Sequence, residues 1–371
     1  MTPQPTPARI VEPNGEVRVG WFDRPFVYPN LQDARPQHAL AGLHGGPFQG
    51  LEKRFRRWRL KQWQYGSVVT DSTLFACAVV DVGYLGSAFA YVVNRHTGER
   101  FEWAAKQPLS QRVAVAQSSI KGTSRFERRN WGHIDIHNHP DNHQRVVSVR
   151  LHGELGAVPK PPLRVELRIF DDPQHIQPIV VVEQSAPKLW LYTHKSYGLL
   201  VEGSLQCGTI QQRLQCGDGL AGFDYNRGYR QRRTWWNWAA ASGRTNDGTI
   251  VGFNLTAHRP WTTQGSQRNT PPDAADCGFW LDGTLTKLSR VDFAYNPDSL
   301  LEPWHIFDAD GLVDLHFAPE GKRSEHTHAG IVTSLFHQPY GHFTGTLSAR
   351  AGRKVTLENV YGVTEQHYAL W

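Results

Sequence analysis

The sequence predicts an all-β protein made of two consecutive lipocalin-like barrels of the calycin type. Short β-prone segments recur along most of the 371 residues, turn residues separate them, and no hydrophobic pattern of period 3.6 is sustained. Strands at such short intervals are typical of sandwiches and barrels, and a chain of this length favours two domains. We expect an N-terminal barrel over residues 1–194, with an irregular lead-in over residues 1–50, and a C-terminal barrel over residues 195–371.

Composition excludes several classes of protein. Hydrophobic residues make up 39% of the chain and charged residues 20%, which excludes an intrinsically disordered chain. No apolar run approaches the ~18 residues of a membrane-spanning helix, and the first residues lack the apolar stretch of a secretory signal. We therefore expect a cytoplasmic protein with no integral membrane segment. The four cysteines show no Cys-x-x-Cys spacing, which argues against a zinc knuckle or a redox pair.

The first half of the chain shows the pattern of successive hairpins. Residues 74–82 are nearly all apolar, which in so short a run indicates a strand buried on both faces. Residues 89–93 and 101–103 flank a glycine-containing turn, as in a β-hairpin. Further strands are expected at residues 113–115, 124–129, 133–137, 145–151, 163–170 and 179–183. Polar and apolar residues alternate in several of them, so one face of each should be buried.

A basic run, Lys53-Arg54-Phe55-Arg56-Arg57-Trp58-Arg59, precedes these strands. Cations interleaved with aromatic rings can follow a phosphate backbone. The run can also be one solvated strand face whose aromatic side chains point inward, and we favour this second interpretation. No nucleic-acid partner is therefore predicted, and no pattern in the sequence indicates an oligomeric state.

The second half repeats the same rhythm. Strands are expected at residues 199–205, 208–215, 222–225, 234–241, 249–255, 278–281, 285–295, 304–307, 313–317, 331–336, 342–347 and 355–364. Asp-Gly dipeptides at residues 247–248, 282–283 and 310–311 indicate tight turns between them. Sequential hairpins of this kind close into barrels whose interior can hold a small apolar ligand.

From about Leu43 onward, the chain resembles a family catalogued only as a domain of unknown function. The shared motifs are Gly-Pro-Phe-x-Gly-Leu at residues 46–51, Trp-Trp-Asn-Trp-Ala-x-Ala-Ser-Gly at 235–243, Pro-Trp-x-Ile at 303–306, Tyr-Gly-x-Phe-x-Gly at 340–345 and Tyr-Gly-Val-Thr-Glu-Gln-His-Tyr-Ala-Leu-Trp at 361–371. The likeness is specific because these motifs are long and keep their order.

A second resemblance covers mainly residues 197–260 and is more distant. Its elements are Gly203, Gly208, Gly217, Gly219, Asp224, Trp236 with Trp238, the Asp247-Gly248 turn and the apolar residues 251–255. In this order they are similar to the carotenoid 1,2-hydratase and AttH-like proteins. That resemblance implies paired lipocalin-like barrels and, by analogy, protonation and hydration or cyclisation of large, apolar, unsaturated molecules.

Asp224 is the first candidate for such chemistry. In the hydratase-like pattern the matching acid lies at the barrel mouth, where an aspartic acid kept protonated by apolar neighbours could protonate a double bond. The alternative is a carboxylate that pairs with Arg227, Arg230 or Arg232 and holds a loop.

The tryptophans around Asn237 are candidate ligand contacts. Side chains alternate along a strand, so Trp236 and Trp238 share one face while Trp235 and Asn237 share the other. Either pair can line a pocket, and either can fill a core. The predicted ligand contacts are completed by Tyr225, Tyr340, His342 and Trp371.

Glu365 and His367 fall on one face of the last expected strand. A neighbouring carboxylate moves the titration of an imidazole across neutral pH, so the pair suits a proton relay. The alternative is a strand that closes the second barrel, with Glu365 bonded to an arginine inside it.

The run from Gly132 to His143 is a candidate metal site. In an extended chain His133, Asp135 and His137 project from one face, and three such ligands could hold zinc or another divalent ion. A polar, solvated face beside a turn explains the run equally well. A second group could complete such a site across the barrel, namely His326, His328, His337 and His342.

These patterns predict a cofactor-free hydratase, lyase or isomerase that acts on an unsaturated lipid- or terpenoid-like molecule in an apolar pocket. Asp224 would be the acid, the tryptophans would stabilise cationic character, and Asn237 and Tyr225 would orient the substrate. Two alternatives stay open: a carrier of an apolar ligand without chemistry, and a metal-dependent enzyme that uses residues 133–143. A buried Asp224 with a raised pKa beside a water-accessible cavity would favour the enzyme.

Overall fold

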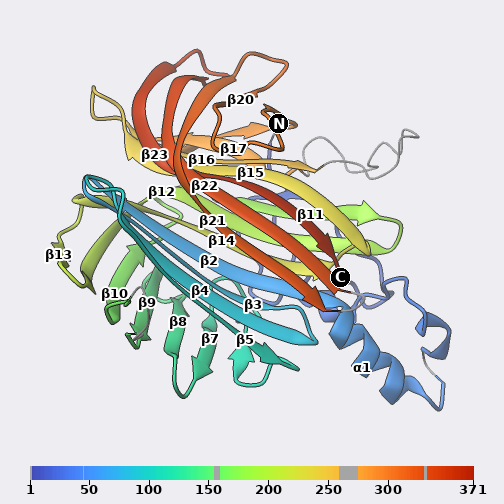
Figure 1. The fold of residues 1–371 in the computed structure, drawn as a ribbon. Coiled ribbons are helices and arrows are strands. Elements are labelled where there is room, and N and C mark those ends of the chain that lie inside the picture. The colour runs from blue at the N-terminus through green and yellow to red at the C-terminus, as the bar shows by residue number, and fades with distance from the viewer. Residues whose placement is uncertain (1, 45, 154–158, 259–274, 330–331) are drawn as a thin grey trace.

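The strands of the protein form two curled antiparallel sheets (Figure 1). The computed structural model describes residues 2–44, 46–153, 159–258, 275–329 and 332–371. Within these residues one sheet has 14 strands, the other has 9, and every ladder between named strands is antiparallel. The all-β prediction is thus confirmed, and the two expected barrels correspond to these two curled sheets.

The larger sheet is built from the first part of the chain. Its strands are β1 (Gly20–Phe22), β2 (Leu60–Thr70), β3 (Thr73–Asp81), β4 (Leu85–Asn94), β5 (Arg100–Pro108), β6 (Val113–Ala114), β7 (Gly122–Arg128), β8 (Gly132–His139), β9 (Gln144–Leu151), β10 (Leu163–Phe170), β11 (Ile179–Ala186), β12 (Leu189–Cys207), β13 (Ile210–Leu214) and β14 (Gly219–Tyr229). Their main order is β5-β4-β3-β2-β14-β12-β10-β9-β8-β7-β6. Strand β3 also contacts β6, β7 and β8 from the far end of that order, because the sheet curls back on itself.

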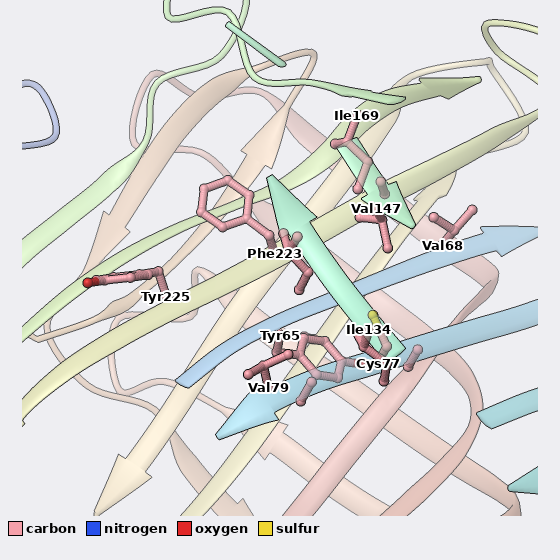
Figure 2. Packing of buried hydrophobic residues seen from close by; sticks show 14 of the residues in the cluster. Tyr65, Val68, Cys77, Val79, Ile134, Val147, Ile169, Phe223 and Tyr225 are labelled. Carbon is pink, nitrogen blue, oxygen red and sulfur yellow. The ribbon is translucent and has the colours of Figure 1, made fainter. Parts of the chain in front are cut away.

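Alternation of polar and apolar residues sets the inner face of this sheet. In β10, Leu163, Val165, Leu167 and Ile169 are buried while the residues between them are exposed. Figure 2 shows Val147 and Ile134, from β9 and β8, packed in the same interior as side chains from β2, β3 and β14. The apolar run at residues 74–82 forms β3, whose first seven residues are all buried, as expected for a strand covered on both faces.

The smaller sheet follows in the chain and carries a second core of its own. Its strands are β15 (Arg233–Arg244), β16 (Ile250–His258), β17 (Cys277–Leu281), β18 (Thr284–Leu288), β19 (Asp292–Ala294), β20 (Trp304–Phe307), β21 (Val313–Ala329), β22 (Val332–Ser348) and β23 (Lys354–Leu370). Their order is β18-β17-β16-β15-β23-β22-β21-β20-β19.

The predicted domain boundary between residues 194 and 195 lies inside strand β12 and does not separate the sheets. Strand β12 continues through it, pairing with β11 over residues 189–195, with β14 over residues 191–200, and with β10 and β13 from Val201 onward. The break in the sequence that suggested this boundary, at residues 186–196, contains the turn of the β11–β12 hairpin and the first residues of β12. The chain changes sheet later, between Tyr229 and Arg233, where β14 ends and β15 begins.

The basic run that we interpreted as a strand face is a helix, α1 (Gln49–Arg59), the one α-helix of the described residues. Its apolar residues Leu51, Phe55 and Trp58 have the spacing of one helix face, and β2 begins at Leu60. Two short 3₁₀ helices, η1 (Leu31–Asp33) and η2 (Ala41–Leu43), precede it in the lead-in. Across the described ranges, no helix combines the length and the apolar character needed to cross a membrane.

Candidate functional site

A cavity of about 170 Å³ lies between the two sheets and is partly open to solvent. One wall comes from β2, β3, β4, β5, β12 and β14, and the other from β15, β16, β21, β22 and β23. Neither half of the chain therefore forms the cavity alone. For scale, an apolar cavity of roughly 150 Å³ holds a molecule of benzene.

Aromatic side chains from both sheets form much of the wall. Trp63 and Tyr65 of β2 face the cavity, as do Trp236 and Trp238 of β15. The rings of Trp63 and Trp236 stack across the two sheets with their centroids 6.1 Å apart, and Tyr65 meets Trp238 edge-on at 5.4 Å. Of the two possible strand faces, the one that carries Trp236 and Trp238 thus lines the cavity.

The other face of β15 does not reach the cavity. Asn237 is buried and donates a hydrogen bond to the Tyr295 hydroxyl at 2.8 Å. Trp235 is half-buried and is not among the cavity-lining residues. The predicted roles of Asn237 in orienting a substrate and of Trp235 in contacting it are therefore wrong for this cavity.

Glu365 and His367 lie side by side on the cavity wall, in the middle of the segment where β23 pairs with β15. The Trp236 indole donates to Glu365 Oε1 at 2.7 Å, and Gln338 donates to Oε2 at 3.2 Å. Burial raises the pKa of Glu365 to about 7, although these two hydrogen bonds oppose the shift. No arginine contacts this carboxyl among the described ion pairs, so the expected arginine partner is not found there.

His367 is held as a neutral imidazole. Its Nε2 lies 2.9 Å from the Ser334 hydroxyl, and its Nδ1 lies 3.8 Å from Glu365 Oε1. Burial lowers the pKa of His367 to about 3, and the nearby Arg230 charge adds to this effect. At neutral pH the pair thus consists of a carboxyl group near its midpoint and an uncharged imidazole.

Asp224 is buried on the same cavity and pairs with a lysine instead of an arginine. Lys195 lies directly opposite Asp224 in the β12–β14 ladder, and its Nζ is 3.1 Å from Asp224 Oδ2 and 2.9 Å from Asp276 Oδ2. Burial raises the pKa of Asp224, while the charge of Lys195 counters part of that rise. Burial alone would lower the pKa of Lys195, but the two carboxylates raise it.

Lys195 and Asp276 are site residues that the sequence patterns did not reveal. The one available signal was a polar pair, His194-Lys195, inside a segment that is otherwise typical of a buried strand. Asp276 precedes β17 and shows no motif around it. Only the tertiary fold brings it to Lys195.

Several buried polar atoms on the cavity wall have no hydrogen-bond partner among the described residues, and three of them concern the chemistry of the site. These three are Asp224 Oδ1, Thr256 Oγ1 and His367 Nδ1. Buried polar groups normally find a partner in the protein or in ordered water. The cavity is thus equipped to receive a polar group or water next to its apolar wall.

Charged side chains also line the cavity. Lys106 Nζ lies 2.7 Å from Glu325 Oε1, and the Arg323 guanidinium also pairs with Glu325. Burial would raise the pKa of Glu325, but these two cations lower it. The Arg230 guanidinium lies over the rings of Trp63 and Trp236, at 4.6 and 5.2 Å from their centroids. The faces of these two rings are thus already in contact with a cation.

Of the remaining predicted ligand contacts, only Trp371 lines the cavity. Tyr225 is buried in the core of the larger sheet, where its hydroxyl donates to the Ala116 carbonyl at 2.7 Å. Tyr340 is buried against Gly321, and His342 lies 2.8 Å from Glu320 Oε1. Tyr225, Tyr340 and His342 therefore do not contact a ligand in this cavity.

The histidine run forms the outer face of β8. Arg125 holds Asp135 through Nε at 2.8 Å, and the His137 ring lies beside the His139 ring with centroids 4.1 Å apart. In the part of the chain that the structure describes, His133, Asp135 and His137 do not bring three ligand atoms within 4.8 Å of one another. The group that does so is His305, Asp314 and His316. A metal at residues 133–143 stays a prediction without geometric support.

Comparison with known proteins gives a family and a fold. The family profile described as "Domain of unknown function (DUF2804)" matches residues 3–371, and no curated protein matches the chain. Among solved structures, an AttH-like protein of Nitrosomonas europaea aligns over 83% of this chain and 92% of its own, at 10% identity and a TM-score of 0.48. Kievitone hydratase of Nectria haematococca aligns over 84% and 89%, at 7% identity and a TM-score of 0.43.

Proposed function

This chain belongs to the DUF2804 family, and we propose that it is a cofactor-free hydratase, lyase or isomerase for a small, mainly apolar, unsaturated molecule. The observation that carries the proposal is Glu365, a buried carboxyl group with a pKa of about 7 in an aromatic cavity. General acids are most effective when their pKa is close to the working pH. A second carboxyl group of different character, Asp224, lines the same cavity.

Glu365 is a better proton donor than Asp224, which reverses our expectation from the sequence. The Lys195 ammonium contacts Asp224 and favours its ionised form, whereas the contacts of Glu365 are the neutral donors of Trp236 and Gln338. Two carboxyl groups whose surroundings differ in this way can divide the roles of acid and base. We assign the acid role to Glu365 and the base role to Asp224.

In hydration, Glu365 transfers its proton to one carbon of the double bond, which forms the new C–H bond. The oxygen of a water molecule bonds to the other carbon, which forms the new C–O bond. The proton that this water loses goes to the free Oδ1 of Asp224. Elimination of water is the same sequence in reverse. In isomerisation, Glu365 protonates one carbon of the double bond and a different carbon then loses a proton to a carboxylate. The uncharged His367 lies next to Glu365 and can pass a proton between the carboxyl group and solvent.

The substrate fits an apolar cavity with one polar corner. A volume of about 170 Å³ accommodates a ring or a short branched alkenyl group, and any larger part of the molecule would extend through the opening. Because Arg230 already lies over Trp63 and Trp236, these rings offer less stabilisation to a carbocation than the sequence suggested. A double bond that is conjugated to a carbonyl group suits this wall better, because the charge of the reaction then develops on the carbonyl oxygen.

The test begins with the apolar molecule that the purified protein carries, identified by native mass spectrometry and solvent extraction. That molecule and its close unsaturated analogues are then incubated with the protein in D₂O. We expect deuterium at a former alkene carbon with the wild type and none with Glu365→Gln. Recovery of a bound apolar molecule with no exchange or product in either protein would identify a carrier instead. If nothing apolar is recovered and no exchange occurs, the proposal fails.

A further inference from the structure

Helix α1 turns apolar side chains toward solvent. Phe48, which precedes the helix, and Leu51 and Trp58 within it are 62%, 54% and 41% exposed. Together with the half-buried Phe55, Leu51 and Trp58 form a stripe with the i, i+4, i+7 spacing of one helix face. A helix of a globular protein normally packs such a stripe against its core.

The buried face of α1 is instead polar. Glu52 and Arg56 are buried beneath the helix, with Arg56 Nε 3.5 Å from Glu52 Oε1. Arg56 also donates to the Ala34 carbonyl at 2.8 Å, and His38 Nε2 lies 3.1 Å from Glu52. These contacts fix the helix to the lead-in, where Phe55 also meets the His38 ring at 5.5 Å. The exposed Leu51 and Trp58 side chains stay available for something outside the chain.

Exposed cations flank the stripe. Lys53, Arg54 and Arg57 all face solvent, and the Arg54 guanidinium lies 6.0 Å from the centre of the Trp58 ring. The helix contains one acid, Glu52, and that residue is buried. Cations beside exposed leucine and tryptophan are the composition of helices that lie in the surface of an anionic bilayer. Nucleic acid would use the cations but would leave Leu51 unused.

We propose that α1 docks the protein on an anionic lipid bilayer, with Phe48, Leu51 and Trp58 in the interface and Lys53, Arg54 and Arg57 against lipid headgroups. The helix leads directly into β2 and the cavity wall. Lys61 links them, because its Nζ donates to the Trp58 carbonyl at 2.9 Å and lies 4.4 Å from the ring of Tyr84, which lines the cavity. Docking would thus set the cavity close to the lipid surface.

The full chain is tested by flotation with vesicles of phosphatidylcholine alone or with phosphatidylglycerol added. We expect binding to the anionic vesicles only. Arg54→Gln with Arg57→Gln should weaken it by roughly 30-fold, since each cation near an anionic surface contributes about a fivefold factor. Leu51→Ser with Trp58→Ser should weaken it as well. Leu301→Ser, at an equally exposed leucine far from α1 in the sequence, should bind like the wild type.

Circular dichroism checks that each variant is folded. If the variant with Leu51→Ser and Trp58→Ser is unstable, the variant with Arg54→Gln and Arg57→Gln still tests the proposal, because both arginines are exposed. Equal binding by all proteins, or no binding to anionic vesicles, would overturn the proposal. So would variants that keep vesicle binding and lose only affinity for duplex DNA or the ability to form dimers. None of these outcomes depends on catalytic activity, so failure here leaves the proposed function untouched.

Discussion

Glu365 connects the chemistry of the cavity to the stability of the protein. Its pKa is raised from 4.5 to about 7 by burial, so the folded state keeps a proton that the unfolded chain has released. Stability from this group is fully present below pH 4.5 and is lost as the pH rises toward 7. Relative to Glu365→Gln, the free energy of unfolding of the wild type should therefore fall by about 3 kcal/mol across that range.

Urea unfolding at several pH values measures this difference. Glutamine keeps an acceptor for the Trp236 indole, and titrating groups that do not interact with Glu365 act alike in both proteins, so their contributions cancel in the comparison. If the free energies of unfolding of the two proteins change in parallel between pH 4.5 and 7, Glu365 is already ionised in the folded protein. It would then be unable to serve as the acid.

Lys195 gives a second prediction at the scale of single residues. Its ammonium contacts two buried carboxylates, Asp224 and Asp276. Lys195→Met keeps much of the side-chain volume but removes the cation that contacts both acids. Loss of one partner of a buried pair typically costs about 3–5 kcal/mol, and urea unfolding should show a loss of this size.

The triple variant Lys195→Met, Asp224→Asn, Asp276→Asn should recover most of that loss, because the two acids that had contacted the lysine are then uncharged as well. Lys188→Met, at an exposed turn position, is the matched control and should change stability by less than about 0.5 kcal/mol. A Lys195→Met protein as stable as this control would mean that the acids do not depend on the lysine.

The sequence can identify a site residue that belongs to a motif, but it cannot identify a contact partner that lies far away in the chain. Asp224, Glu365 and His367 stood out because they belong to recognisable motifs, and the fold brings all three to one cavity. Their contacts could not be foreseen. Lys195 reaches Asp224 through strand pairing, and Glu365 meets Trp236 across the β15–β23 ladder, both at long separations in the chain.

At the scale of elements, the sequence predicts which residues share a strand face, but it does not predict which face lines the cavity. The sequence correctly paired Trp236 with Trp238 on one face of β15, because the side-chain period of a strand is two. Both faces of β15 are buried at its centre, and the polar Asn237 lies on the face away from the cavity, so burial and polarity do not mark the side that meets it. The contact with β2 of the other sheet decides it.

Helix α1 failed as a prediction for a related reason. Its arginines and aromatic residues were judged by the alternation of a strand, whereas Leu51, Phe55 and Trp58 follow the helical period. An inward pair of opposite charges, Glu52 and Arg56, replaces the usual apolar contact with the core. A helix with an exposed apolar stripe resembles neither a standard surface helix nor a solvated strand.

Gly222 offers a prediction for the pairing of β12 with β14. The ring of Tyr197 lies against this glycine, and a Cβ at residue 222 would lie 2.0 Å from Tyr197 Cδ1. Gly222→Ala must therefore displace a buried ring that also contacts Trp238. Overpacking of this kind costs about 1–3 kcal/mol, and thermal or urea unfolding should show it.

Gly66→Ala is the matched control in the neighbouring strand β2. A Cβ at this residue would meet no atom within 4 Å, so the variant should be as stable as the wild type or slightly more stable. If both alanine variants lose the same free energy of unfolding, the loss comes from reduced strand flexibility and not from the clash with the Tyr197 ring.

For the whole molecule, two curled sheets were predictable because strand spacing repeats along the chain. The place where one sheet gives way to the next was not. Residues 186–196 resemble a linker in the sequence, but they hold the β11–β12 turn and the start of β12. The true crossing is a short connection after Tyr229. The consequence is functional, because the cavity belongs to both sheets and would be cut by any division near residue 194.

This arrangement predicts the behaviour of the two halves when they are made separately. Division within the short connection after Tyr229, at residue 231, leaves Trp63 and Tyr65 in one fragment and Trp236 and Trp238 in the other. Each fragment then exposes aromatic residues that normally meet across the cavity. We expect neither fragment alone to bind an apolar fluorescent probe at one site, and co-expressed fragments to associate and recover the binding of the intact chain.

The measurement is a probe titration of each fragment, of the co-expressed pair and of the intact protein. Trp236→Ala in the second fragment provides a specificity control, since it removes one ring of the stacked pair and should weaken probe binding without preventing association. A single fragment that binds the probe as tightly as the intact chain would place the ligand within one sheet. That result would contradict a site built from both sheets and, with it, the division of acid and base between Glu365 of one sheet and Asp224 of the other.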